Sequence, residues 1–109
     1  MTLGSIRLAV QPNDEVEELL RQGLAILTQA LPAGHWRIAE AESRLGAGLA
    51  ARDKAAEAEP LLVSGYEGLL RGRGARSGKT VAALERLIAF YEGQGNATAV
   101  VAYRAKLPH

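Results

Sequence analysis

The segment GRGARSGKT, residues 72–80, has the composition of a loop that binds phosphate. In such a loop the pattern G-x-x-x-x-G-K-[ST] lets consecutive backbone N–H groups surround the phosphates. Counting back five residues from Gly78 reaches Arg73 and not a glycine, so the register is wrong. A phosphate loop also follows a β-strand, whereas the apolar spacing before this segment is helical. We therefore expect a turn between two helices, with Ser77 as the cap of the second, and no nucleotide binding.

A weak anion site is the alternative interpretation of the same segment, because four basic residues gather there without an acid from residue 68 to 84. They are Arg71, Arg73, Arg76 and Lys79. An exposed basic turn is more often simply solvated.

Other residues with catalytic or metal-binding chemistry are few. The chain has no cysteine and only two histidines, His35 and His109, so it offers no thiolate and no metal-ligand spacing. No serine has a base whose pairing the sequence reveals. Four carboxylates fall in one helical turn, where they suit a helix N-terminus, and a catalytic carboxylate pair there is the less favoured alternative. They are Asp14, Glu15, Glu17 and Glu18. We therefore expect a protein that is not an enzyme and has no metal or cofactor.

Size and charge exclude further classes. The chain has 109 residues, enough for one domain, and its net charge of +1 creates no field that attracts nucleic acid or anionic lipid. No apolar run approaches the ~20 residues of a membrane helix, and the N-terminus shows no signal-peptide pattern. These features predict a cytoplasmic domain with neither nucleic acid nor membrane as a partner. The many alanines and few aromatic and β-branched residues favour helices over a sheet.

The apolar positions coincide when the sequence is shifted by 42 residues, which indicates an internal repeat. The shift places Leu45 on Leu87, Leu49 on Tyr91 and Arg44 on Arg86. Within each unit the apolar residues step by three or four, as on one face of an α-helix, and glycine or proline marks the breaks. The sequence therefore predicts an all-α fold with about five helices, over 14–31, 36–52, 54–72, 78–93 and 96–106.

The stretch HWRIAEAESRLGAGLAARDKAAEAEPLLVSGYEGLL, residues 35–70, resembles a tetratricopeptide repeat of the long-period variety found in kinesin light chains and in bacterial helical-repeat tails. Gly46 and Ala58 match the small-residue positions of that motif, and Leu45, Leu49 and Leu62 match its large apolar positions. The resemblance implies a short right-handed α-solenoid of stacked helical hairpins. It divides the chain into a half repeat at 13–31, a repeat at 33–74 and a weaker C-terminal repeat at 75–107, after a poorly defined N-terminal remnant at 1–12. It also implies a turn or capping role for His35.

In the family it resembles, the first helix of each hairpin lines a concave groove that binds peptides. Here that groove lies along helices 36–52 and 78–93. Its expected lining is Glu40, Ser43, Arg44, Ala47, Ala82, Glu85, Arg86 and Ala89, with Ala51 as a further candidate. Long-period relatives often carry asparagines that clamp a peptide backbone, and this chain has Ser43-Arg44 and Glu85-Arg86 instead. Arg44 and Arg86 could form a ladder for acidic groups, since guanidinium pairs with carboxylate. The alternative is that Glu40 and Arg44, four residues apart, merely pair with each other.

The function expected from this resemblance is a non-catalytic adaptor or scaffold that binds a protein or peptide in the groove. Trp36 either packs between hairpins or anchors the partner. The alternative is a regulatory or oligomerising C-terminal segment of a larger enzyme, such as a bacterial serine/threonine kinase. Helix 14–31 has apolar residues on more than one face, so part of it should need a cover. The cover could be an upstream hairpin of a longer chain, a partner, or a second copy, and we favour the second copy, which gives a homodimer through this helix. These residues are Val16, Leu19, Leu20, Leu24, Ile26, Leu27 and Leu31.

Overall fold

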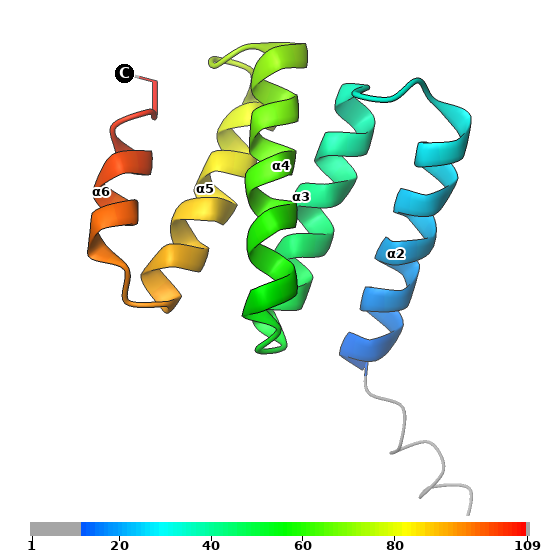
Figure 1. Ribbon diagram of the computed structural model, residues 1–109, viewed down its shortest axis with the longest axis horizontal. Coiled ribbons are helices and arrows are strands. Elements are labelled where there is room, and N and C mark those ends of the chain that lie inside the picture. The colour runs from blue at the N-terminus through cyan, green and yellow to red at the C-terminus, as the bar shows by residue number, and fades with distance from the viewer. Residues whose placement is uncertain (1–11, 109) are drawn as a thin grey trace, which may run out of the picture.

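The computed structural model describes residues 12–108, and these contain helices but no strand. The five helices are α2 (Pro12–Ala30), α3 (Trp36–Ala51), α4 (Ala55–Arg73), α5 (Gly78–Gly93) and α6 (Ala97–Arg104) (Figure 1). Their ends lie within about two residues of the predicted ones, so the all-α prediction is confirmed. The predicted N-terminal remnant lies outside the described residues, apart from Pro12. None of the described helices is both long enough and apolar enough to span a membrane.

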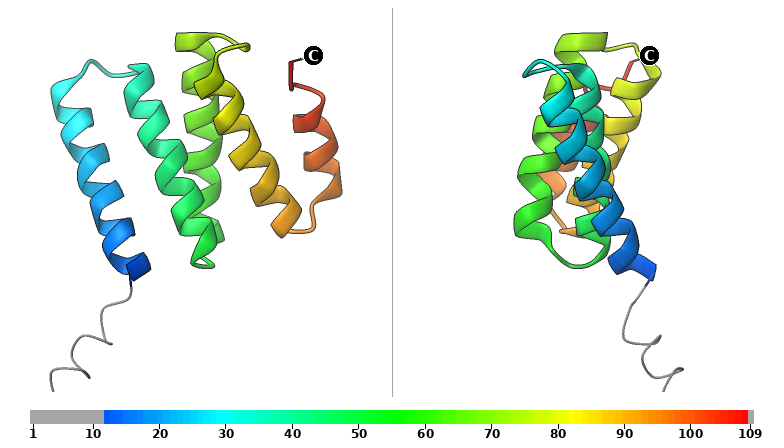
Figure 2. Two further views of the ribbon diagram at one scale, coloured as in Figure 1. Left: turned by 180° about the vertical axis from the view of Figure 1, so that it is seen from behind. Right: turned by 90° about the vertical axis from the view of Figure 1, so that its right-hand side faces the viewer.

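Short turns with specific capping residues separate the helices. His35 precedes α3, and its Nδ1 accepts a hydrogen bond from the backbone N–H of Arg37 at 3.1 Å, which confirms the expected capping role. Asn96 caps α6 in the same way, through the N–H of Ala99. The turn after α4 begins at Gly74, whose φ of +85° is readily adopted only by glycine. The helices consequently stop and restart within a few residues, and chain neighbours run in opposite directions (Figures 1 and 2).

Close packing of α3 on α4 forms the centre of the core. A Cβ atom at Gly65 would lie 2.7 Å from the carbonyl oxygen of Ala39, and one at Gly68 would lie 2.6 Å from the Ala39 Cβ. The missing side chains therefore let the two backbones approach, and Leu49 and Leu62 are fully buried beside them. Gly46 and Ala58, the predicted small positions, are buried in the same contact.

Helix α5 packs on both helices of this hairpin, and α6 follows it (Figure 2). Leu84 and Leu87 are buried between them, and the Tyr91 ring stacks on Tyr103 of α6 with ring centres 5.6 Å apart. Helix α2, at the opposite end, packs on α3, and its Arg21 forms an ion pair with Glu57 of α4 at 3.1 Å. The arrangement is compatible with a stack of helical hairpins that opens with a single helix.

Candidate functional site

The loop at 72–80 joins two helices, α4 and α5, and not a strand to a helix. Thr80 would hold a metal ion in a phosphate loop, but its side chain is buried here and its hydroxyl donates to the carbonyl of Leu69 at 3.2 Å. The Lys79 ammonium forms an ion pair with Glu40 at 2.9 Å. Ser77 occupies the predicted cap position, although its side chain makes no capping hydrogen bond. The residues that resemble a nucleotide site therefore connect the two hairpins.

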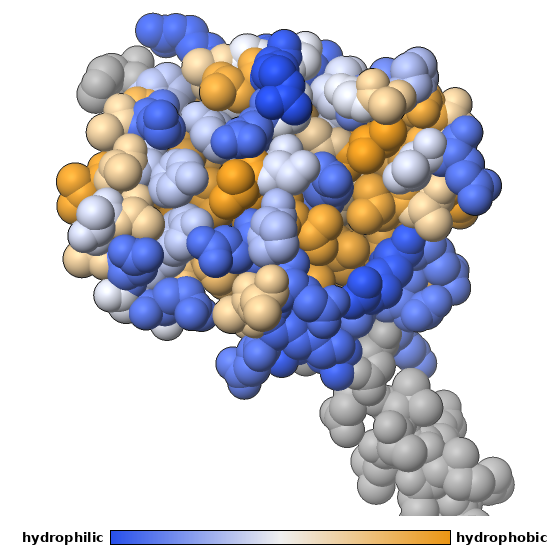
Figure 3. All heavy atoms as spheres, in the orientation of Figure 1, coloured by the Kyte–Doolittle hydropathy of each residue, from blue (hydrophilic) through white to orange (hydrophobic). Residues whose placement is uncertain are grey.

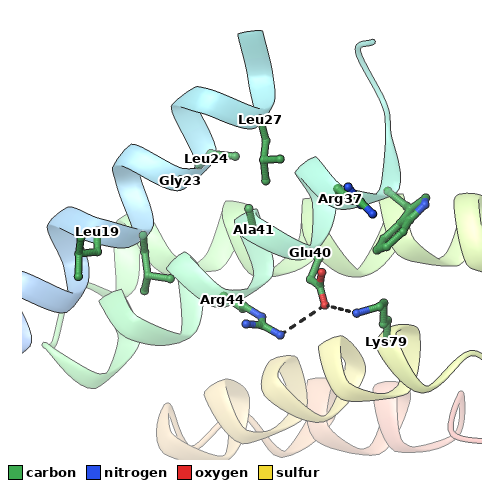
Figure 4. Close-up of a pocket in the computed structure, with 11 residues that line it drawn as sticks. Leu19, Gly23, Leu24, Leu27, Arg37, Glu40, Ala41, Arg44 and Lys79 are labelled. Carbon is green, nitrogen blue, oxygen red and sulfur yellow. Dashed lines mark hydrogen bonds and ion pairs between the residues drawn. The ribbon is translucent and has the colours of Figure 1, made fainter. Parts of the chain in front are cut away.

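A hollow of about 520 Å³ lies between α2, α3 and the start of α5 (Figure 4). One wall is formed by apolar residues of α2, and the other carries charged groups of α3 and α5. The α2 wall comprises Leu19, Leu20, Gly23, Leu24 and Leu27, and the opposite wall includes Trp36, Arg37, Glu40, Ala41, Arg44 and Lys79. Three cations and one carboxylate thus face an apolar wall.

Glu40 lies at the centre of the charged wall. Its Oε2 atom accepts from Lys79 at 2.9 Å and from Arg44 at 3.5 Å, as the dashed lines in Figure 4 show. The pairing of Glu40 with Arg44 within one helix is therefore present, but the shorter contact crosses from α3 to α5. Because one carboxylate is shared between two cations, and the Arg44 side chain is 56% exposed, Arg44 keeps donors that face solvent.

Arg86 and Ser43 differ from the expected lining of the groove. Ser43 is fully buried, so its side chain is not on the groove surface as predicted, and its hydroxyl oxygen accepts from Arg86 Nη1 at 3.0 Å. The pKa of Arg86 lies below its usual value, first because the guanidinium is desolvated and second because the positive charge of Arg44 is near. Glu40 acts in the opposite direction. Arg44 therefore adds an unfavourable positive charge to the surroundings of Arg86.

A second hollow, of about 400 Å³, lies between the C-terminal halves of α3 and α5. Its walls include Ala47 and Ala51 of α3 with Arg86 and Ala89 of α5, all four of which were expected to line the groove. The expected residues Ala82 and Glu85 line neither hollow. The structure thus divides the predicted groove residues between two neighbouring depressions, with Arg44 in one and Arg86 in the other.

Trp36 lies at the start of α3 and lines the first hollow. Its Cβ would lie 2.9 Å from a Cβ placed at Gly72, so the side chain packs against the end of α4. Cationic groups of Arg37, Arg73 and Lys79 lie 4.8–5.5 Å from its ring centre. The half-buried indole therefore belongs to the packed end of the hairpin and is also the centre of a basic patch.

One charged cluster was not predicted from the sequence. Glu17 of α2 accepts from Arg52 at 2.6 Å, from Lys54 at 3.1 Å and from Arg21 at 3.0 Å, and it thereby ties α2 to the turn between α3 and α4. Hydrogen bonds from Lys54 and then from Arg21 lower the pKa of Glu17 to about 2. The acidic first turn is visible in the sequence, but two of the three partners of Glu17, Arg52 and Lys54, lie 35 and 37 residues away in the chain. We interpret the cluster as a structural contact and not a binding site, because both carboxylate oxygens of Glu17 already accept hydrogen bonds from cations of this chain.

The described residues contain no group of three or more His, Cys, Asp or Glu side chains that could hold a metal ion. Every fully buried side-chain nitrogen or oxygen between residues 15 and 108 has a hydrogen-bond partner. Comparison with protein-family models, with curated proteins and with solved structures finds no match to this chain.

Proposed function

We propose that this chain is a non-catalytic interaction module of the tetratricopeptide type, which binds a protein or peptide segment in the groove lined by α3 and α5. The observation that carries the proposal is the hydrogen bond from Arg86 to Ser43, the residue next to Arg44, which brings one arginine from each helix to two hollows bordered by α3 and α5. The 42-residue repeat and the stacked helices support it, because repeat arrays of this kind present extended binding surfaces.

The charges of the groove favour an acidic ligand. The Arg44 side chain is more than half exposed and shares its carboxylate with Lys79. Arg86 donates to a neutral hydroxyl, that of Ser43, and lies near a like charge. A carboxylate placed between the two guanidinium groups would reduce their repulsion and accept bidentate hydrogen bonds. The preferred ligand is thus a segment that contains Asp or Glu.

A random peptide-display library tests this proposal, because it offers the groove acidic and non-acidic segments in competition. The protein should enrich peptides that contain Asp or Glu, and Arg44→Glu with Arg86→Glu should abolish that preference. A matched control, Arg71→Glu with Arg76→Glu, makes the same change of charge at two exposed arginines outside both hollows. The single variant Arg44→Glu keeps the Arg86–Ser43 hydrogen bond. If the double variant does not fold, the single variant still tests whether the acidic preference depends on Arg44.

Two results would contradict the proposed groove. One is a library that shows no acidic enrichment with the unchanged protein. The other is a control pair that loses binding while the groove pair keeps it, which would place the anion site in the basic turn at residues 71–79.

A second candidate function is favoured by a different surface. Val16, Leu19 and Ile26 of α2 are largely exposed, as expected of a segment that self-associates or packs on another part of a larger enzyme. An oligomerising segment of an enzyme such as a bacterial serine/threonine kinase fits that observation, and it does not exclude a binding groove on α3 and α5.

A further inference from the structure

Helix α2 carries a second apolar stripe beside the face that it packs on α3. Leu20 and Leu24 pack against the core. The stripe consists of Val16, Leu19, Gly23, Ile26 and Ala30, whose spacing is 3, 4, 3 and 4 residues. Two of its members, Leu19 and Gly23, also border the first hollow. This is the spacing of a seam between two packed helices.

The stripe is uncharged over its whole length, and its large side chains are exposed. Val16 is 51% exposed, and Leu19 and Ile26 are each 66% exposed. A Cβ atom at Gly23, in the middle, would meet no atom within 4 Å. At 1.5 Å per residue the stripe is about 21 Å long. Figure 3 shows hydrophobic surface on the side of the molecule where α2 lies. Because the stripe has the spacing of a helix–helix seam and carries no charge, its preferred partner is another helix and not a polar ligand.

We propose that this stripe pairs with the same stripe of a second copy, with the two α2 helices antiparallel and crossing at Gly23. The stripe is self-complementary in size when its direction is reversed. Val16 then faces the smaller Ala30 of the partner subunit, and Leu19 lies beside Ile26 of the partner subunit. The two glycines meet at the centre, where the absence of side chains allows the helices to approach closely.

Charge decides the antiparallel direction. Glu15 and Glu18 are exposed near the N-terminal end of the stripe, and Glu17 beside them is already paired. A parallel pair would bring the two acidic ends together, which is unfavourable. An antiparallel pair brings each acidic end to the end of the partner where α3 begins and where Arg37 is exposed. It also aligns the two helix dipoles in opposite directions.

The area available predicts a weak dimer. A stripe about 21 Å long and roughly 10 Å wide presents a few hundred Å² per copy, which is below the ~800 Å² per partner of a standard stable interface. We therefore expect a dissociation constant in the range of about 10–100 µM, and a mixture of monomer and dimer at accessible concentrations.

Sedimentation equilibrium of the full chain from roughly 5 to 500 µM tests the association. The apparent mass should rise from 11.6 kDa towards twice that value. Ile26→Glu should weaken the dimer at least ~10-fold, because it places a charge in the seam. The matched control is Val101→Glu on α6, at the opposite end of the molecule, where a β-branched residue is 69% exposed. Ile26 lines neither hollow of the groove, so peptide binding should survive this substitution.

Cysteine cross-linking tests the direction, since the chain has no cysteine of its own. Gly23→Cys lies on the proposed two-fold axis and should form a disulfide with itself under mild oxidation. Val16→Cys should not, whereas a mixture of Val16→Cys with Ala30→Cys should form the mixed disulfide. A Val16→Cys homodimer would show that the helices are parallel and would overturn the proposed crossing.

Two further outcomes would overturn the proposal. One is a monomer over the whole concentration range. The other is a dimer that survives Ile26→Glu and is lost with Val101→Glu, which would indicate head-to-tail association through α6.

Discussion

A methyl group added at residue 65 is the most direct test of the packing between α3 and α4. In Gly65→Ala the new Cβ would lie 2.7 Å from both the carbonyl oxygen of Ala39 and the backbone nitrogen of Ser43. Both neighbours are backbone atoms of α3, so no flexible side chain can move aside. Gly23→Ala is a matched control, because it also places alanine inside a helix but its Cβ meets nothing within 4 Å.

The two substitutions should change stability in opposite directions. Alanine is favoured over glycine inside a helix by about 0.5–1 kcal/mol, and both variants gain this contribution. At residue 65 the two helices must also separate by several tenths of an ångström, and overpacking of a core typically costs about 1–3 kcal/mol. We therefore expect Gly65→Ala to be less stable by about 1–2 kcal/mol and Gly23→Ala to be more stable by about 0.5–1 kcal/mol.

Thermal unfolding followed by circular dichroism measures both changes. For a domain of this size, 1 kcal/mol shifts the melting temperature by roughly 4–8 °C, so Gly65→Ala should melt about 5–15 °C lower and Gly23→Ala a few degrees higher. The measurement belongs at low micromolar concentration, where association through α2 does not contribute. An equal rise of the melting temperature in both variants would refute the close approach of α3 and α4.

Three further predictions concern charged groups. Glu17 has a pKa of about 2 in the folded protein against 4.5 for the free group, so the stability it contributes is present above about pH 5 and is lost as the pH falls towards 2. Glu17→Gln should consequently lower the melting temperature at pH 7 and flatten its decline between about pH 5 and 2. Lys79→Ala should lower stability by no more than about 1 kcal/mol, because its ion pair is partly exposed, and ATP with magnesium should change the melting temperature of neither protein. Iodide should quench the fluorescence of Trp36, the only tryptophan, at least ~2-fold more efficiently than caesium, because three cations lie around its ring. Arg73→Ala should reduce this difference between the two ions.

Each of these predictions has a contrary result. The structural contact at Glu17 is refuted by an acid-unfolding curve that Glu17→Gln leaves unchanged. Micromolar affinity for ATP that disappears with Lys79→Ala would show that residues 72–80 do bind phosphate. Equal quenching by the two ions would mean that the basic patch does not reach the indole.

Helix positions were predictable because their signals are local. Apolar residues at steps of three and four, together with glycine and proline at the breaks, place α3 at Trp36–Ala51 against a prediction of 36–52. The burial of Leu45 and Leu49 follows from the same pattern, whereas the cap at His35 was expected only from the resemblance to a repeat family. Each of these features depends on residues within one or two helical turns, so the sequence alone contains the information.

The charged contacts were less predictable because they join helices that are distant in the chain. Helical spacing anticipated the contact of Glu40 with Arg44, but the shorter contact to Lys79 depends on where α5 packs. Likewise, the acidic turn of α2 is visible in the sequence, whereas the bases that surround Glu17 come mainly from the turn between α3 and α4. Their identity depends on the angle at which α2 meets that turn, which no local pattern specifies.

A shift of the sequence by 42 residues places Arg44 on Arg86, yet the structure gives the two arginines different surroundings. Arg86 lies on α5, which packs on the preceding hairpin, so it is partly desolvated and donates to the buried hydroxyl of Ser43. Arg44 lies on α3, faces the hollow beside α2, and is exposed. In an array of stacked hairpins, two residues at matching positions can differ in this way, because each has other neighbours. In the proposed groove we therefore expect Arg86 to be held in place by Ser43, and Arg44 to be the arginine able to reorient towards a ligand.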